Sequence, residues 1–136
     1  MSLPVAVDDE LLVVAFLLRQ ADVAAVVGAQ VGTQVPDGLP SVRVTRLGGL
    51  SPTPHRLDKP RVQIECRGTD QAAAKDLVGL VRAAMPQIVG VHPAGCVTAV
   101  DEYLGPQWLP DVVGDQRVAA TARYIFAVQL TTHPNT

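Results

Sequence analysis

The side chains in this sequence that could do chemistry are few and scattered. Its three histidines are His55, His92 and His133, and none has a Cys, Asp or Glu at the spacing of a metal site. Asp101 and Glu102 are adjacent carboxylates, but neighbouring residues of a strand point to opposite faces, so the two do not converge on one substrate. The sequence therefore predicts neither a metal site nor a paired-carboxylate catalytic site.

The motifs of the common enzyme folds are also missing. The sequence contains no nucleophile elbow, no P-loop and no dinucleotide fingerprint. The pair Gly48-Gly49 lacks the Lys/Ser pair and the helix that follow a phosphate loop. Cys66 alternates with Val62 and Ile64, so it is expected in the core rather than as an exposed nucleophile. We predict that the protein is not an enzyme and binds no cofactor.

The composition fits a single domain spanning residues 1–136. Apolar residues make up 48% of the chain and charged residues only 18%, which favours burial of some surface against partners. The net charge is −2 and the basic residues are scattered, so the sequence predicts no basic patch for binding nucleic acid. The apolar run Leu11–Leu18 is shorter than the about 20 residues that a bilayer requires, and the N-terminus lacks the basic start of a signal peptide. A soluble protein made in the cytoplasm, with no membrane partner, is expected.

The first half of the chain alternates between helical and strand patterns. Acidic residues 8–10 precede an apolar run and complement a helix dipole, which predicts a helix up to Arg19, with a short further turn over Ala21–Gly28. Strict alternation predicts strands over Ser41–Leu47 and Arg61–Arg67. The Gly- and Pro-rich stretch Gly48–Pro60 between them is interpreted as a long loop.

The second half predicts one more helix and two more strands. Thr69 is the expected N-cap of an amphipathic helix over Ala72–Met85. Strands are expected over Cys96–Leu104 and Arg117–Thr131, separated by a second long loop, with a frayed tail over about residues 132–136. The predicted fold is α+β: an antiparallel sheet of about four strands with two main helices packed on one face, in the order helix-strand-strand-helix-strand-strand.

Two groups of residues are candidates for contacts with partners. Charged side chains occupy the outward positions of the predicted sheet, namely Arg61, Glu65 and Arg67, with Arg43 and Arg123 on other strands. They form either a solvated surface or a field of salt bridges between subunits.

The second group lies in the loop after residue 104. Trp108 is the only tryptophan, and it is flanked by Pro106 and Leu109. Exposed aromatic residues are enriched at interfaces. The alternative is that Trp108 folds back and covers the edge of the sheet.

Several short motifs, taken in order, resemble a known family. They are Leu39–Val44 followed by Gly48-Gly49, then Leu57–Ile64, the helix Ala72–Met85, the segment Gly105–Asp111, and Arg117 with Arg123-Tyr124 and the apolar strand after it. Together, from about Pro40 to Leu130, they resemble the tail terminator proteins of bacteriophages with long non-contractile tails, particularly those of actinobacterial hosts.

The resemblance implies a virion structural protein at the junction of tail and neck, assembled in the host cytoplasm. Such a protein forms a homohexameric ring that caps the tail tube, stops its polymerisation and joins the tail to the neck, while DNA only passes through the lumen. Its implied partners are further copies of itself, the major tail tube protein and a neck or head-completion protein. The Gly48–Pro60 stretch, with Arg56 and Asp58, and the Pro106–Asp111 stretch, with Trp108, are then the expected contact segments.

Two alternatives remain open at this stage. One is another neck or tail-completion component of the virion. The other, from a different class, is a small ligand-binding or regulatory α+β domain that dimerises through its sheet.

Overall fold

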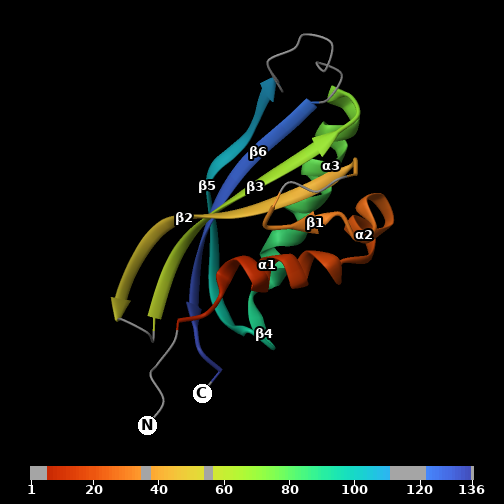
Figure 1. Cartoon of the computed structure of the whole chain (residues 1–136). Helices are drawn as coiled ribbons and strands as arrows, with labels where there is room; N and C mark the ends of the chain where they lie inside the picture. Colours follow the sequence, from red (N-terminus) through yellow and green to blue (C-terminus); the bar gives the residue numbers. More distant parts are fainter. Residues whose placement is uncertain (1–5, 35–37, 54–56, 111–121, 136) are drawn as a thin grey trace.

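A six-stranded mixed sheet, covered on one face by helices, forms the body of the protein (Figure 1). The computed structural model describes residues 6–34, 38–53, 57–110 and 122–135. The strand order is β1-β2-β3-β6-β5-β4, and all neighbours are antiparallel except β1 and β2. The strands are β1 (Val31–Gly32), β2 (Ser41–Thr53), β3 (Leu57–Gly68), β4 (Gly90–His92), β5 (Gly95–Pro110) and β6 (Ala122–His133).

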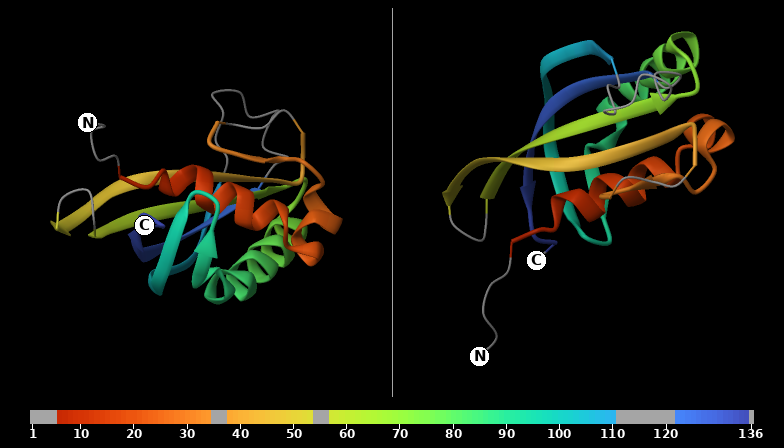
Figure 2. Two further views of the ribbon diagram at one scale, coloured as in Figure 1. Left: turned by 90° about the horizontal axis from the view of Figure 1, so that it is seen from below. Right: turned by 45° about the horizontal axis from the view of Figure 1, so that its top comes forward.

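The predicted four-stranded antiparallel sheet with two helices is therefore wrong. Six strands curl into a half-barrel, and three α-helices pack with them (Figure 2). The additional strands β1 and β4 have two and three residues, too few to produce a periodic signal in the sequence. At the C-terminal end, β6 continues into the stretch expected to fray, and Thr132 is fully buried.

The first predicted long loop proves to be largely strand, and so does the part of the second that the structure describes. Residues 48–53 continue β2 and residues 57–60 begin β3, so the first stretch forms the end of a long hairpin. Residues 105–110 likewise extend β5. Glycine and proline indicated loops, but here they accompany register shifts between Arg46 and Gly49 and between Leu104 and Gln107, where strands bend without ending.

Acidic side chains cap the N-termini of α1 and α3. In α1 (Asp9–Leu18), the Asp8 carboxylate accepts a hydrogen bond from the Leu11 N–H at 3.1 Å. In α3 (Gln71–Ala84), Asp70 and not Thr69 is the N-cap, and it accepts from the Ala73 N–H at 2.8 Å. Between them, α2 (Ala21–Val27) ends at Gly28, and the 3-10 helix η1 (Met85–Ile88) follows α3.

The core lies between the helices and the face of the sheet they cover. Strand alternation places one set of side chains there, and α1 and α3 contribute their apolar stripes. Cys66 is fully buried, as its alternation with Val62 and Ile64 predicted. The principal core residues are Val42, Val44, Val62, Ile64, Phe126, Val128 and Leu130 from the sheet, and Leu12, Val13, Phe16, Leu17, Leu77 and Val81 from the helices.

The β2–β3 hairpin reaches well beyond the helices (Figure 2). Its outer part is paired in the register Gly49 to Pro60, Leu50 to Lys59 and Thr53 to Leu57. The opposite end of the sheet carries the last residues of β5, where Trp108 pairs with Tyr124 of β6. Cys66, the β3 partner of Tyr124, lies nine residues from Leu57, which separates the two ends by roughly 30 Å.

The two margins of the sheet are covered over short stretches only. At one margin, β1 pairs with Val42 and Arg43 of β2, and farther along the Arg46 N–H donates to the Glu10 carboxylate at 3.0 Å. At the other margin, β4 pairs with the first residues of β5, whose ladder to β6 then has three register shifts.

Candidate assembly surfaces

A buried group of polar residues fixes the base of the projecting hairpin. Arg46 Nη1 donates to Asp9 Oδ2 at 2.6 Å and to Asp58 Oδ2 at 2.8 Å, and Nη2 donates to Asp58 Oδ1 at 3.1 Å. The Thr132 hydroxyl donates to Asp9 Oδ1 at 3.2 Å. We call Asp9, Glu10, Arg46, Asp58 and Thr132 the Arg46 cluster. It joins α1, β2, β3 and β6, so the hairpin leaves the body of the protein from a fixed base.

The electrostatics of this cluster are dominated by burial. Removal from water raises the pKa of the Asp9 carboxyl to about 6, although Arg46 opposes the rise. The hydrogen bonds that Arg46 donates to the Asp58 carboxylate raise the pKa of the Arg46 guanidinium, so Arg46 stays charged. Asp58, predicted as a contact residue, is itself buried inside the cluster and acts on the hairpin through Arg46.

The outer part of the hairpin exposes apolar side chains. Leu47 and Leu50 are 49% and 66% exposed, which is a high fraction for leucine in a paired strand. Gly48 and Gly49, both predicted as interface residues, lie between them in β2 with positive φ angles. Arg56, also predicted, lies outside the described residues.

The sheet face opposite the helices, called the outer face below, is charged. Glu65 is buried there, with Oε1 accepting from Arg67 Nε at 2.6 Å and Oε2 accepting from Arg123 Nη1 at 3.1 Å. Arg61 is exposed and lies over the ring of Tyr103, 5.3 Å from its centroid. The structure thus brings the predicted residues Glu65 and Arg67 together and places Arg61 farther along the same face.

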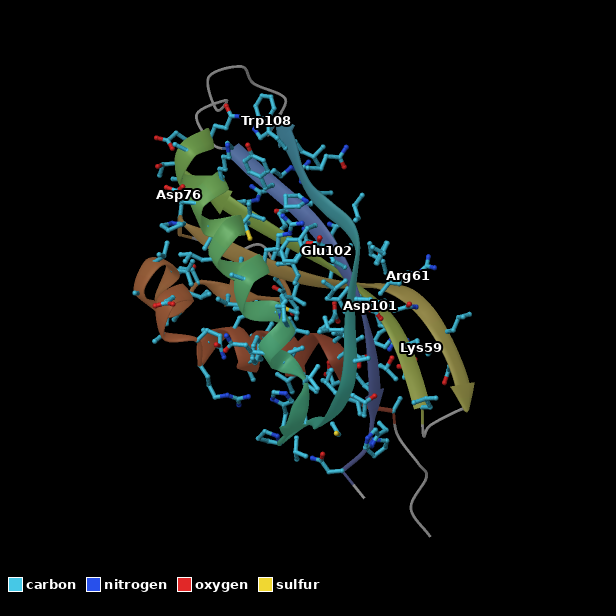
Figure 3. The ribbon with its side chains drawn as sticks, turned by 180° about the vertical axis from the view of Figure 1, so that it is seen from behind. Lys59, Arg61, Asp76, Asp101, Glu102 and Trp108 are labelled. Carbon is cyan, nitrogen blue, oxygen red and sulfur yellow. The ribbon has the colours of Figure 1, made fainter. Side chains whose placement is uncertain are left out.

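The third predicted group lies at the other end of the sheet. Pro106 and Trp108 are exposed on β5, and Leu109 is half-buried opposite Arg123. Trp108 is 45% exposed beside Tyr124. Figure 3 shows Trp108 far from Lys59 and Arg61, so this group and the hairpin form two separate surfaces.

An apolar groove adds a surface that the sequence did not reveal. It has a volume of about 370 Å³ and lies between α1 and the β4–β5 turn. Arg19 Nη2 and His92 Nδ1 are 3.0 Å apart at its edge. Its lining residues are Leu11, Leu12, Ala15, Arg19, His92, Pro93 and Ala94.

Sequence reasoning also missed the key residues of the Arg46 cluster. Arg46 shares its parity with the buried Val42 and Val44, so an arginine at a core-facing position was the available signal for a buried partner. Within residues 6–34, 38–53, 57–110 and 122–135, no three His, Cys, Asp or Glu side chains gather as metal ligands do. No helix in these ranges has the length and apolarity needed to cross a membrane.

These surfaces suit assembly, and comparison with known proteins identifies the kind of assembly. The model of a family described as phage tail termination protein matches residues 6–133. The chain belongs to this family. The resemblance in the short sequence motifs is thereby confirmed. As a tail termination protein it is a structural component of the virion with a role in tail completion.

A solved structure agrees in fold. One chain from the virion of a native gene transfer agent particle superposes with a TM-score of 0.64 at 20% sequence identity. The match covers 94% of this tail termination protein and 98% of that chain. A search of curated proteins found no match.

Proposed function

We propose that the protein acts as a ring of six copies that caps the tail tube, stops its polymerisation and provides the seat for the neck. Family membership supports a role in tail completion. This proposal includes the ring and its six-fold symmetry, the tube and neck partners, and the passage of DNA through the lumen. In this proposal the protein acts by binding its partners and by closing into a ring, and no catalytic step is assigned.

One observation carries the proposal: the fixed hairpin that presents Leu47 and Leu50 to solvent. A paired hairpin held by the Arg46 cluster loses little conformational entropy on docking, so apolar burial there contributes fully to binding. At the far end of the sheet, Trp108 and Pro106 present a different surface. A terminator needs two unlike ends, because one must accept the tube and the other must refuse another tube subunit.

A ring also requires unlike surfaces between neighbours. Contacts that pair two different patches generate a closed ring when the rotation closes. The sheet meets this requirement, since helices cover one face and charged residues cover the other. We assign Arg61 and Arg67 to contacts between subunits, with the buried Glu65 holding Arg67 in position, and the hairpin and the Trp108 end to the axial partners.

The test is a polymerisation assay with purified tube protein of the same phage. Adding this protein to growing tubes is expected to stop elongation and to leave a six-fold ring at one end in negative-stain images. Tube lengths are measured against time with and without the protein. Unchanged elongation at saturating protein contradicts the proposal. Binding to neck protein without binding to tube ends would instead indicate another neck component.

A further inference from the structure

Helix α1 is apolar on two sides, and only one of them faces the core. The buried side consists of Leu12, Val13, Phe16 and Leu17. On the other side, Leu11, Ala15 and Leu18 recur at the spacing of one helix face. Leu11 is 56% exposed and Leu18 is 39% exposed. Because a surface helix ordinarily turns polar residues to water, this second apolar stripe indicates a contact surface.

The apolar groove lies along this stripe. Leu11 and Ala15 line it from α1, and the β4–β5 turn contributes Pro93 and Ala94 on the other side. Its volume of about 370 Å³ is within the range of ligand pockets, about 300–1,000 Å³. From Leu11 to Arg19 the helix axis advances about 12 Å, which is long enough for one or two apolar side chains of a docked segment.

The edge of the groove carries one positive charge. Arg19 can only donate, so His92 Nδ1, 3.0 Å from Arg19 Nη2, is the acceptor. The His92 proton then lies on Nε2, which donates to the Ile88 carbonyl oxygen at 2.6 Å, and the imidazole in this arrangement is neutral. No lining residue is acidic, and no Asp or Glu of the described ranges forms an ion pair with Arg19. The charge of Arg19 is therefore not compensated.

This combination defines the chemistry of the occupant. The apolar lining favours an apolar side chain over a polar one. The planar guanidinium of Arg19 fits a carboxylate, and its charge repels a basic group. The groove is therefore complementary to a segment in which an apolar side chain is followed by a carboxylate.

The position of the groove indicates which partner supplies that segment. Asp58 of β3, Thr132 of β6 and Val97 of β5 lie in one row across the sheet. The hairpin tip and the β4–β5 turn both lie just beyond this row, so the groove is at the end of the sheet from which the hairpin projects. A partner that docks on Leu50 at this end is also the one that reaches the groove.

We propose that the groove between α1 and the β4–β5 turn binds a segment of the axial partner at the hairpin end. An apolar side chain of that segment packs along Leu11 and Ala15, and a carboxylate beside it accepts hydrogen bonds from Arg19. This inference rests on the proposed function, because it names the chemistry by which that partner is recognised.

The chemistry of the groove is tested with three small probes, octanoate, octanamide and octylamine. They share one apolar chain and differ in the charge of the head group. Binding is measured from the NMR shifts of the Ala15 and Ala94 amides. Octanoate is expected to bind about three- to fivefold more tightly than octanamide, as an exposed ion pair allows, and octylamine more weakly than either. Arg19→Gln should abolish the preference for octanoate, and Leu11→Ser should weaken the binding of all three.

The partner is tested with Arg19→Glu in the tube-capping and neck-binding assays. Arg19→Glu is expected to weaken, by about fivefold or more, binding of the same partner that Leu50→Ser weakens. Leu11→Ser should act on that partner too. Lys75→Gln is the control, because it removes a charge from an exposed position on α3 and should change neither probe binding nor partner binding. Circular dichroism of every variant checks the fold.

The outcomes separate this inference from the proposed function. Equal binding of octanoate and octanamide overturns the carboxylate site, as does a preference that survives in Arg19→Gln. Wild-type capping that Arg19→Glu and Leu11→Ser leave unchanged overturns the role of the groove and leaves the proposed function standing. Loss of self-association alone in these variants identifies a second copy as the occupant and also overturns the inference. Absence of both capping and neck binding by the wild type overturns the proposed function and the assignment of the partner with it.

Discussion

At Gly49 the backbone of β2 runs so close to β3 that a side chain has no room. A Cβ atom there would overlap the Lys59 carbonyl oxygen and lie 2.8 Å from Pro60 Cα, at a φ of +122°. Gly49→Ala is therefore expected to destabilise the protein by about 2–4 kcal/mol. Gly48→Ala is the matched control, because Gly48 also has a positive φ but no atom within 4 Å of the added Cβ, and it should cost about 1 kcal/mol. Urea denaturation measures both, and equal costs would contradict the close approach.

Asp9 is expected to make stability depend on pH. Its folded pKa of about 6 lies above the ordinary value of 3.8, so the folded state binds the proton more tightly than the unfolded chain. The stabilising contribution is therefore complete below about pH 3.8 and is lost as the pH rises through about 6. Relative to Asp9→Asn, which does not titrate, the wild type should gain about 1–2 kcal/mol between pH 7.5 and pH 4.5. Denaturation of both proteins at the two pH values is the measurement, and a parallel pH dependence would exclude this role.

The burial of single residues could be predicted where it depends on neighbours in the sequence, as in the alternation along a strand. Alternation along β3 placed Cys66 in the core and Glu65 and Arg67 on the opposite face, as the structure has them. The role of Arg46 was not predictable, because its partners Asp9 and Asp58 are 37 and 12 residues away in the sequence and meet it only after the sheet forms. Periodicity carries no information about such pairings.

Among the elements, the hairpin shows most clearly where sequence reasoning failed. Gly48, Gly49 and several prolines indicated a loop, since these residues are depleted in strands. In the structure, bulges accommodate them and both strands continue toward the tip. The extents of α1 and α3 were better predicted, because their apolar stripes are encoded within a few residues, although Asp70 and not Thr69 caps α3.

The hairpin should bind its partner through Leu50. Leu50→Ser removes an apolar side chain that is 66% exposed, so the free energy of unfolding should change by no more than about 0.5 kcal/mol. Capping of tubes should weaken by about tenfold or more if Leu50 becomes buried on docking. Tube lengths at graded protein concentrations provide the measurement.

Val26→Ser is the control for this experiment. Val26 is 42% exposed on α2, away from the hairpin, and its replacement should leave capping unchanged. Equal loss of capping in both variants would indicate a general effect of surface polarity and remove the special role of the hairpin.

For the whole molecule, the order of short motifs predicted more than any single element did. The resemblance spread over most of the chain identified the family, which the match to residues 6–133 confirms. The same motifs did not predict the six-stranded mixed sheet, because β1 and β4 are defined by long-range pairing rather than by their own composition.

The fluorescence of Trp108 can be used to follow assembly of the protein with its partners. It is the only tryptophan and is 45% exposed, so its emission comes from one known place on the surface. If the Trp108 end meets a partner, adding that partner should shift the emission to shorter wavelength as water is excluded. Fluorescence titration with tube protein and with neck protein separately identifies which of them binds this end. An unshifted spectrum with both, at concentrations where binding occurs, would leave Trp108 outside the contacts.

The partly covered margins of the sheet bear on how the protein avoids aggregation before it is assembled. A bare strand edge would invite amyloid-like stacking of copies of the chain. Glu10 accepts a hydrogen bond from the Arg46 N–H at one margin, and the irregular β5–β6 ladder distorts the flat edge that stacking requires at the other. A protein proposed to end the growth of the tail tube is thus built so that its own copies do not stack into another polymer.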